Sequence, residues 1–175
     1  MINYENRIWG LRAGKNGSAH NIFIEKKFVV LEDAKMGNLA ALEATRDSFC
    51  KKYRRIHPED TRTGSAGIAG KYFRFIVEMK IGDLIVYPSV RDKQVYVGEL
   101  TGEYKYVADS DFPHCRAVKW HYIVPKSEFT TPAIYELGAA RTLFEFKRNR
   151  DELISRIKSD SAIPFKSRNK SKGKK

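Results

Sequence analysis

Three aromatic residues occur in one stretch that also carries acids and should form a loop between two strands. Tyr104 and Tyr106 are two positions apart, so an extended chain would point both rings to one face. Phe112 follows directly after Asp111. Aromatic faces can stack on a flat nucleobase, and a carboxylate can accept a hydrogen bond from an exocyclic amine. The alternative is that the two tyrosines cover the mouth of a small barrel and that Phe112 belongs to the core.

Asp60, Glu78 and Lys80 offer a catalytic alternative, because their order resembles the Asp…Glu-x-Lys pattern of metal-dependent nucleases. In such enzymes the carboxylates bind Mg²⁺ and the lysine steadies the attacking water. That aspartate should end an apolar strand, whereas Asp60 is expected to begin a loop after a helix. The four histidines lack metal-ligand spacing, and no Ser-His-Asp or Cys-His arrangement stands out. We therefore expect binding rather than catalysis, with no cofactor and no metal.

The charge of the chain favours an anionic partner. Its 175 residues include 33 Lys and Arg against 21 Asp and Glu, which gives a formal net charge of +12. Residues 161–175 hold six of the positive charges and no acid, yet the remainder still holds more basic than acidic side chains. A basic body of this kind most often binds nucleic acid, although plain solubility explains many basic domains equally well.

Length and composition indicate one globular domain, residues 1–160, followed by a basic tail, residues 161–175, that should be disordered or a linker. The N-terminus lacks the apolar region of a secretory signal, and no apolar run approaches the ~20 residues of a membrane span. Cys50 and Cys115 form neither a disulfide framework nor a zinc site. We expect a cytoplasmic protein with no membrane partner.

Short apolar runs rich in β-branched and aromatic residues, separated by turn residues, predict an α+β domain built around antiparallel strands. Trp9 and Trp120 are expected in its core. Helical spacing and capping residues predict helices from Asn38 to Ile56, from Pro132 to Gly138, and from Asn149 or Asp151 to Ile157. The expected strands are residues 7–12, 28–31, 72–77, 84–87, 94–100, 115–120 and 143–146, with a short strand or turn at 22–24.

Several basic residues could contact a phosphate backbone. Lys15 and Ser18 lie in a small polar loop that could hold a phosphate or a base edge, unless the loop is an ordinary flexible connection. Cations near the end of the long helix also suit the helix dipole. The glycine-rich segment 59–70 could enter a groove with a basic residue on each flank, although a mobile surface loop is the simpler interpretation. The expected phosphate contacts are Lys15, Ser18, Lys51, Arg55, Arg62, Lys71 and Arg116.

The order of several short motifs resembles that of PUA-like domains of the EVE and YTH type. The motifs are WGLRAG, FVVLED, YFRF, KIGDLIVYP, VYVGELTGEYKY, HCRAVKW, PKSEF and ELGAARTLFEF. More narrowly, residues 5–148 are similar to the N-terminal modified-base readers of modification-dependent (type IV, Mrr- or Mcr-type) restriction endonucleases. The resemblance implies a small curved antiparallel β-barrel flanked by helices. Its pocket would take a nucleobase flipped out of duplex DNA and test it for a modification.

The same resemblance implies which residues surround the base. Residues 12–14 fall where the related readers contact it with backbone and side chains. Tyr104 or Tyr106, and then Phe112, fall near the second and third walls of their aromatic cage. Phe28 is the one aromatic residue in the segment that should supply the first wall, where YTH proteins carry a tryptophan. Together with the acid of the aromatic loop, the expected base contacts are Arg12, Ala13, Gly14, Phe28, Tyr104, Tyr106, Asp111 and Phe112.

These observations predict a non-catalytic reader of double-stranded DNA that carries methylated or hydroxymethylated cytosine, or methyladenine. One buried methyl group contributes only ~0.8 kcal/mol, about fourfold in affinity, so sharp discrimination needs a further contact. A nuclease or motor domain could be joined through the C-terminal tail. The rival interpretations are a PUA-like RNA-binding module and, less favoured, the small Mg²⁺-dependent nuclease described above.

Overall fold

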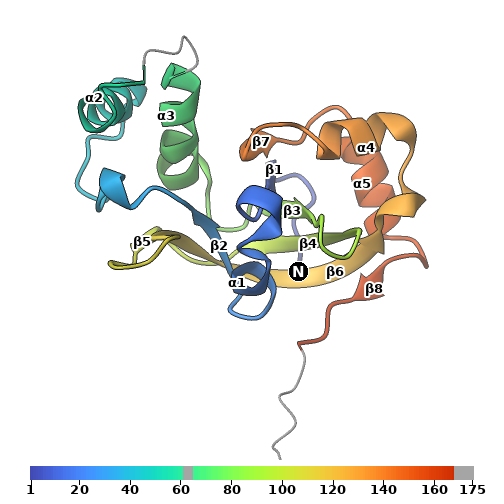
Figure 1. Cartoon of the computed structure of the whole chain (residues 1–175). Coiled ribbons are helices and arrows are strands. Elements are labelled where there is room, and N and C mark those ends of the chain that lie inside the picture. The colour runs from blue at the N-terminus through green and yellow to red at the C-terminus, as the bar shows by residue number, and fades with distance from the viewer. Residues whose placement is uncertain (61–64, 168–175) are drawn as a thin grey trace, which may run out of the picture.

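The structure, a computed structural model, describes residues 1–60 and 65–167, and its centre is a curled mixed sheet. The strands are β1 (Ile8–Leu11), β2 (Phe28–Leu31), β3 (Leu84–Pro88), β4 (Gln94–Leu100), β5 (Lys105–Tyr106), β6 (His114–Pro125), β7 (Leu143–Glu145) and β8 (Ile163–Pro164). Their order is β2-β6-β4-β3-β1-β7, and β5 and β8 also pair with β6. The sheet forms a half-barrel flanked by helices, which confirms the expected α+β class and its coarse architecture (Figure 1).

The direction of the strands differs from the expectation at one pair. β1 and β3 run parallel, with Ile8 opposite Leu84, whereas the other paired strands run antiparallel. The sheet is therefore mixed rather than purely antiparallel. A register shift between Val97 and Gly98 interrupts the pairing of β4 with β6, and irregularities of this kind increase the local bend of a sheet.

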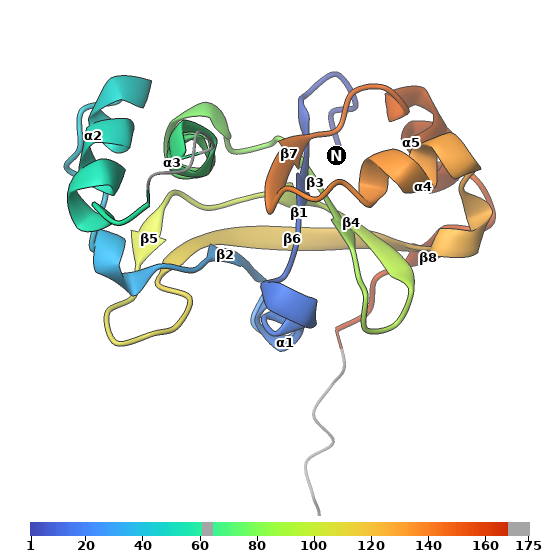
Figure 2. The ribbon, with the colours of Figure 1, turned by 45° about the horizontal axis from the view of Figure 1, so that its top comes forward.

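Helices stand at both ends of the sheet. They are α1 (His20–Ile24), α2 (Arg46–Ile56), α3 (Ser65–Phe73), α4 (Thr131–Leu137) and α5 (Arg150–Ile157), with short helical turns η1 (Lys15–Gly17), η2 (Ala34–Met36), η3 (Arg74–Glu78) and η4 (Lys126–Glu128). Figures 1 and 2 show α2 and α3 together at one end and α4 and α5 at the other, with β1 and β7 between them. Within the described part of the chain, no helix has the length and apolar character that crossing a membrane requires.

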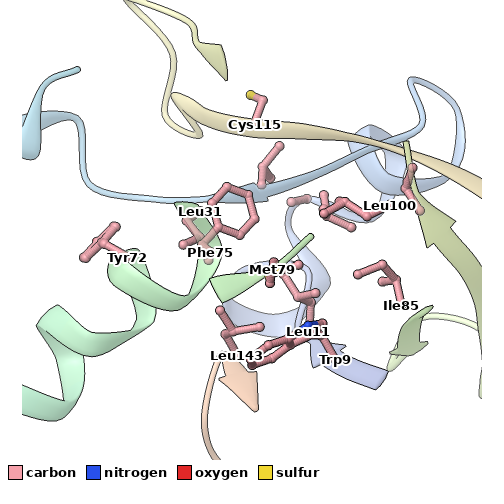
Figure 3. Close-up of a cluster of buried hydrophobic side chains, with 14 of the residues drawn as sticks. Trp9, Leu11, Leu31, Tyr72, Phe75, Met79, Ile85, Leu100, Cys115 and Leu143 are labelled. Atoms are coloured by element: carbon pink, nitrogen blue, oxygen red, sulfur yellow. The ribbon is translucent and has the colours of Figure 1, made fainter. Parts of the chain in front are cut away.

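The larger apolar core joins the sheet to α3 and η3. Figure 3 shows side chains of β1, β2, β3, β4, β6 and β7 meeting those of the helical segment that contains Tyr72 and Phe75. Trp9 and Trp120 are both buried there, as the sequence predicts. Each indole N–H is satisfied: Trp9 Nε1 donates to Asp83 at 2.9 Å, and Trp120 Nε1 donates to the Phe23 carbonyl oxygen at 2.7 Å.

Two helical regions correct the expectations from sequence. Residues 72–77 form the end of α3 and the start of η3, not a strand. Tyr72, Phe75 and Met79 are buried at spacings of three and four, so the helical period of this segment is the one that serves the core. α2 begins at Arg46 rather than after Asn38, because Thr45 supplies the N-cap and its Oγ1 accepts from the Ser48 N–H at 3.2 Å. The short segment 22–24 belongs to α1.

The C-terminal tail begins later than expected. β8 pairs with β6, with Tyr122 opposite Pro164, and the Phe165 N–H donates to the His121 carbonyl oxygen at 2.9 Å. Phe165 also packs against the main core. The ordered body therefore extends past residue 160, and the part of the tail from residue 168 onward lies outside the described residues.

Candidate functional site

A cavity of about 600 Å³ opens beside Gly14, and we call it the Gly14 hollow. Its walls come from the loop after β1, the end of β2, α3 and the β3–β4 hairpin. The loop after β1 meets that hairpin because β1 and β3 are neighbours in the sheet. The volume lies within the roughly 300–1,000 Å³ typical of small-molecule sites. The lining includes Arg12, Ala13, Gly14, Lys15, Lys71 and Tyr87.

Gly14 lets three side chains crowd against the backbone at the floor of this hollow. Its φ of +69° and ψ of −177° belong to a region that is essentially restricted to glycine. A Cβ at this position would lie 2.5 Å from Ser18 Oγ, 3.1 Å from Phe112 Cε1 and 3.2 Å from Glu32 Oε1. A hydroxyl, an aromatic ring and a carboxylate therefore converge on one short piece of backbone.

The rim of the hollow is formed by two loops packed on each other. Gly17 has a φ of +72°, and a Cβ there would lie 3.1 Å from the Arg91 side chain and 3.2 Å from Val90. The β3–β4 turn is fixed internally, because Ser89 Oγ accepts from the Arg91 N–H at 3.1 Å. Arg91 and Val90 remain exposed at the rim, where a ligand can reach them.

Cationic side chains surround the Gly14 hollow and continue beyond it. A second cavity of about 430 Å³ lies between α3 and residues 140–143 and shares Lys71 and Thr142 with the first. The cations are Arg12, Lys15, Lys71 and Arg91 in the first cavity and Arg46, Arg74 and Arg141 in the second. We call this continuous set the basic groove. It receives positive charge from α3 on one side and from the β1 and β7 loops on the other, and a cleft whose lining is predominantly cationic attracts an anionic chain.

Lys71 lies where the two cavities meet. Its ammonium lies 5.1 Å from the centre of the Tyr72 ring, and burial lowers the pKa of Lys71 against the opposing effect of the Glu32 and Asp33 carboxylates. A partly desolvated cation interacts with an incoming anion more strongly than a fully solvated one does. Lys71 is therefore the residue of the groove best placed to bind a phosphate between the two cavities.

The structure brings together only part of the predicted base-binding set. Residues 12–14 line the Gly14 hollow, whereas Phe112 packs beside Gly14, with Cε1 3.1 Å from the position of a Gly14 Cβ, without lining the hollow. Phe28 and Phe112 line a separate apolar cavity of about 210 Å³, which shares Val30 with the Gly14 hollow. Asp111 is exposed and lines neither cavity.

Tyr104 and Tyr106 contact His114 instead of the Gly14 hollow. The Tyr104 hydroxyl lies 2.8 Å from His114 Nδ1 and accepts from the Leu39 N–H at 3.3 Å. His114 Nε2 lies 3.0 Å from the Asp33 carbonyl oxygen, which can only accept, so Nε2 carries the hydrogen and Nδ1 accepts from the tyrosine. Burial lowers the pKa of His114, which keeps this arrangement neutral. We call Tyr104, Tyr106 and His114 the His114 cluster.

Arg116 corrects one of the predicted phosphate contacts. Its side chain is 1% exposed and donates to the carbonyl oxygens of Gly102, Phe75 and Met79 at 3.0, 2.9 and 2.7 Å. A guanidinium enclosed in this way ties η3 to the sheet and is not accessible to DNA. The sequence of β6 indicated this burial, because side chains alternate between the two faces of a strand. Arg116 is two residues from buried Val118 and therefore shares its face.

The other predicted phosphate contacts fall in three places. Lys15 and Lys71 belong to the basic groove, and Ser18 packs beside Gly14 without lining the hollow. Lys51 and Arg55 are exposed on α2. Arg62 lies outside the described residues.

The residues of the nuclease alternative hold separate structural positions. Asp60 accepts from the Tyr53 hydroxyl at 2.6 Å, whereas Glu78 pairs with Arg46 at 2.7 Å. Tyr53 and Arg46 are seven residues apart on α2, about 10 Å along the helix axis. Lys80 Nζ donates to the Val77 carbonyl oxygen at 2.8 Å. Within residues 1–60 and 65–167, no group of three or more His, Cys, Asp or Glu side chains is arranged to hold a metal ion.

Sequence reasoning missed four cations of the groove and one acid. Arg46, Arg74, Arg91 and Arg141 come from four separate segments, and their proximity depends on how α3 and the β3–β4 hairpin are placed. Glu32 carried a weak signal, because it directly follows the apolar strand β2, and a polar residue at a strand end often faces a site.

The comparison with known families gives one match. A family model described as a domain of unknown function, DUF8426, matches residues 9–147. This span runs from β1 to just past β7 and contains every element that lines the Gly14 hollow and the basic groove. No curated protein matches the chain.

Proposed function

We propose that this chain, which belongs to the DUF8426 family, binds double-stranded DNA along the basic groove and tests one extruded base in the Gly14 hollow. The base would be a modified one, such as methylated or hydroxymethylated cytosine or methyladenine. The domain would serve as the specificity module of a modification-dependent restriction system. The observation that carries this proposal is the continuity of a seven-cation groove with a recess of small-molecule size.

The groove supplies affinity that does not depend on sequence. Each phosphate neutralised by Lys or Arg releases counterions, so the slope of log K against log salt is about −0.9 per contact on duplex DNA. Arg12 and Arg141 lie on one side of the groove and Lys71 and Arg74 on the other, which suits a backbone lying between them. Binding of this kind holds the duplex at the mouth of the Gly14 hollow.

The hollow would recognise a base differently from a cage built of three aromatic rings. Flipping a base costs a few kcal/mol, and stacking on an aromatic side chain returns ~1–3 kcal/mol. Tyr87 lines the hollow but is 1% exposed, so its ring offers almost no surface on which a base could stack. Val30 and Leu31 add apolar surface, and the Gly14 loop adds backbone groups. Recognition would therefore rely more on polar contacts to the base edge than on stacking.

A binding series on matched oligonucleotides tests the proposal. Gel shifts would compare unmodified duplexes with duplexes carrying 5-methylcytosine, 5-hydroxymethylcytosine or N6-methyladenine, and with RNA of the same sequence. We expect at least one modified duplex to bind more tightly than the unmodified one. Equal binding to every duplex would contradict base reading, and tighter binding to RNA than to all DNA would favour an RNA-binding module.

A pair of lysine variants locates the interface within the same series. Lys71→Ala should weaken binding to all duplexes and reduce the salt slope by about 1, since it removes one phosphate contact. Lys119→Ala is the control, because this exposed lysine of β6 lines neither cavity. Equal effects of the two substitutions would place the nucleic acid outside the groove.

A further inference from the structure

One acidic side chain faces the otherwise cationic Gly14 hollow. Glu32 follows β2 directly, and its Oε1 lies 3.2 Å from the position that a Cβ on Gly14 would take. Among the described residues that line this cavity, Glu32 is the only Asp or Glu. Its side chain is exposed, so a molecule that enters the hollow would meet and cover the carboxylate.

Glu32 differs from the acid beside it in how its carboxylate is used. Asp33 accepts from the Lys35 N–H at 3.2 Å and pairs with His57 Nε2 at 2.7 Å, so the fold employs both of its oxygens. No hydrogen bond or ion pair joins the Glu32 carboxylate to another residue of the described chain. Its main chain is fixed, because the Tyr72 hydroxyl donates to the Glu32 carbonyl oxygen at 3.3 Å. Glu32 thus offers an available acceptor on a positioned backbone.

An available carboxylate acts on an extruded base in a way that depends on the base edge. Cytosine and adenine carry an exocyclic amine, which donates, whereas thymine, uracil and hypoxanthine carry a carbonyl oxygen at the same position. A carboxylate accepts from the amine of cytosine in the ordinary pairing of side chains with base edges. The same carboxylate facing a carbonyl oxygen loses its hydration without gaining a donor, which is costly in an enclosed site.

We infer that Glu32 is the residue that restricts the Gly14 hollow to bases with an exocyclic amine at C4 of a pyrimidine or C6 of a purine, that is, to derivatives of cytosine or adenine. This inference rests on the proposed function. The cations around Glu32 bind the flanking phosphates, and Glu32 reads the base. The Asp111 carboxylate, which the sequence put forward for this role, lies outside the hollow.

Pairs of DNA ligands that differ only in the extruded base test the role of Glu32. Fluorescence anisotropy would measure binding of duplexes in which 5-methylcytosine or thymine stands opposite an abasic analogue. These two bases share the 5-methyl group and differ at the amine and carbonyl of the Watson–Crick edge. The pair 5-hydroxymethylcytosine and 5-hydroxymethyluracil and the pair adenine and hypoxanthine extend the comparison. The wild-type protein should prefer the amine member of at least one pair by about tenfold or more.

Two substitutions assign that preference to a residue. Glu32→Gln should reduce it to about threefold or less, because a carboxamide can both donate and accept. Asp111→Asn is the matched control and should leave it unchanged. The melting temperature of Glu32→Gln should lie close to that of the wild type, since the carboxylate makes no hydrogen bond or ion pair within the described chain and acts on Lys71 only through its charge.

The outcomes separate this inference from the proposed function. A wild-type protein that prefers modified over unmodified cytosine, yet binds both members of every pair equally tightly, would retain the proposed function and overturn the inference. An amine preference that persists in Glu32→Gln would also overturn the inference. Equal binding to modified and unmodified duplexes would overturn the proposed function, while an amine preference that still depended on Glu32 would leave the inference standing.

Discussion

The Gly14 hollow and the His114 cluster use the same kinds of side chain in opposite ways. In the His114 cluster, polar and aromatic groups satisfy one another: the Tyr104 hydroxyl accepts from Leu39 and donates to His114, which in turn donates to a carbonyl oxygen. At the Gly14 hollow, the Glu32 carboxylate and the surrounding cations face open volume.

This difference shows which observation indicates a binding site. A stretch that combines aromatic and polar residues is ambiguous in sequence, because the same side chains can join two elements or hold a ligand. The ambiguity is resolved by counting partners, since a buried polar group almost always has one. The polar groups of Tyr104 and His114 are paired within the fold, and the Glu32 carboxylate is directed toward the Gly14 hollow.

Arg116→Ala should give the largest effect and separates structural from binding arginines. We expect a loss of about 3 kcal/mol or more in unfolding free energy, because three carbonyl groups lose their donor. Urea denaturation measures this loss. If the alanine variant does not fold, Arg116→Lys takes its place and should show a smaller loss. Arg12→Ala, at an exposed groove position, should change stability by less than about 0.5 kcal/mol but weaken DNA binding. A stable Arg116→Ala protein with weakened DNA binding would contradict this assignment.

Gly14→Ala should affect the hollow more than the fold. The backbone strain costs of order 1–3 kcal/mol, and DNA affinity should fall by about tenfold, or 1.4 kcal/mol, because the added methyl group displaces Ser18, Phe112 or Glu32. Gly37→Ala is a matched control, since Gly37 has a φ of +61° and a ψ of −169° with no atom within 4 Å of its Cβ position. Both variants should share the backbone strain, and Gly14→Ala should lose more stability in thermal unfolding because its methyl group also meets Ser18 Oγ at 2.5 Å. An equal loss of DNA binding in both would remove the hollow from the binding site.

Tyr104→Phe tests the His114 cluster, the second of the two regions compared above. Removing the hydroxyl deprives Leu39 and His114 of a partner, so stability should fall by about 1 kcal/mol while the preference for a modified base stays the same. Tyr135→Phe, at a fully exposed position of α4, should change neither quantity. A Tyr104→Phe protein of normal stability that no longer distinguishes modified bases would restore this ring to a base cage.

Much of the fold could be predicted because its strands carry local signals. β1, β2, β3, β4 and β7 were expected close to their observed positions, since β-branched runs between turn residues are characteristic of strands, whereas only the first half of β6 was expected. The same reasoning predicted a strand at residues 72–77, and this prediction was wrong. A short run of aromatic residues suits a strand or a buried helix, and contact between α3 and α2 decides between them. The parallel pairing of β1 with β3 is likewise a tertiary outcome with no local signal.

The candidate site could be predicted only where one segment builds it. Residues 12–14 were expected at a pocket from the family resemblance and Lys15 from the small polar loop, and all four line the Gly14 hollow. Lys71 and Arg91 reach the same hollow from elements that are distant in the sequence. The cage was expected for Tyr104 because its partners do not show in the sequence: Leu39 is 65 positions away, and His114, ten positions away, lies on the neighbouring strand β6. Pairing between separate segments determines which polar groups remain available for a ligand. This pairing cannot be predicted from a single sequence.

The smallest effect concerns the two histidines near Asp33, which respond to pH in opposite directions. A hydrogen bond to Asp33 raises the pKa of His57, so its contribution to stability is complete below about pH 6.5 and is lost as pH rises through the folded-state pKa. Burial lowers the pKa of His114 in the folded state. His114 therefore reduces the stability of the protein as pH falls below the ordinary pKa of histidine.

The variant His57→Asn isolates the first of these contributions. Its unfolding free energy should lie below that of the wild type by at most about 1 kcal/mol at pH 5.5, because both partners are partly solvated, and the gap should close by pH 9. Urea denaturation at the two pH values measures the difference, in which the effect of His114 cancels because both proteins contain it. A gap of equal size at both pH values would mean that the His57–Asp33 contact stabilises the end of α2 through hydrogen bonding or packing alone. The pairing that distinguishes Asp33 from Glu32 would then not depend on the charge of the imidazole.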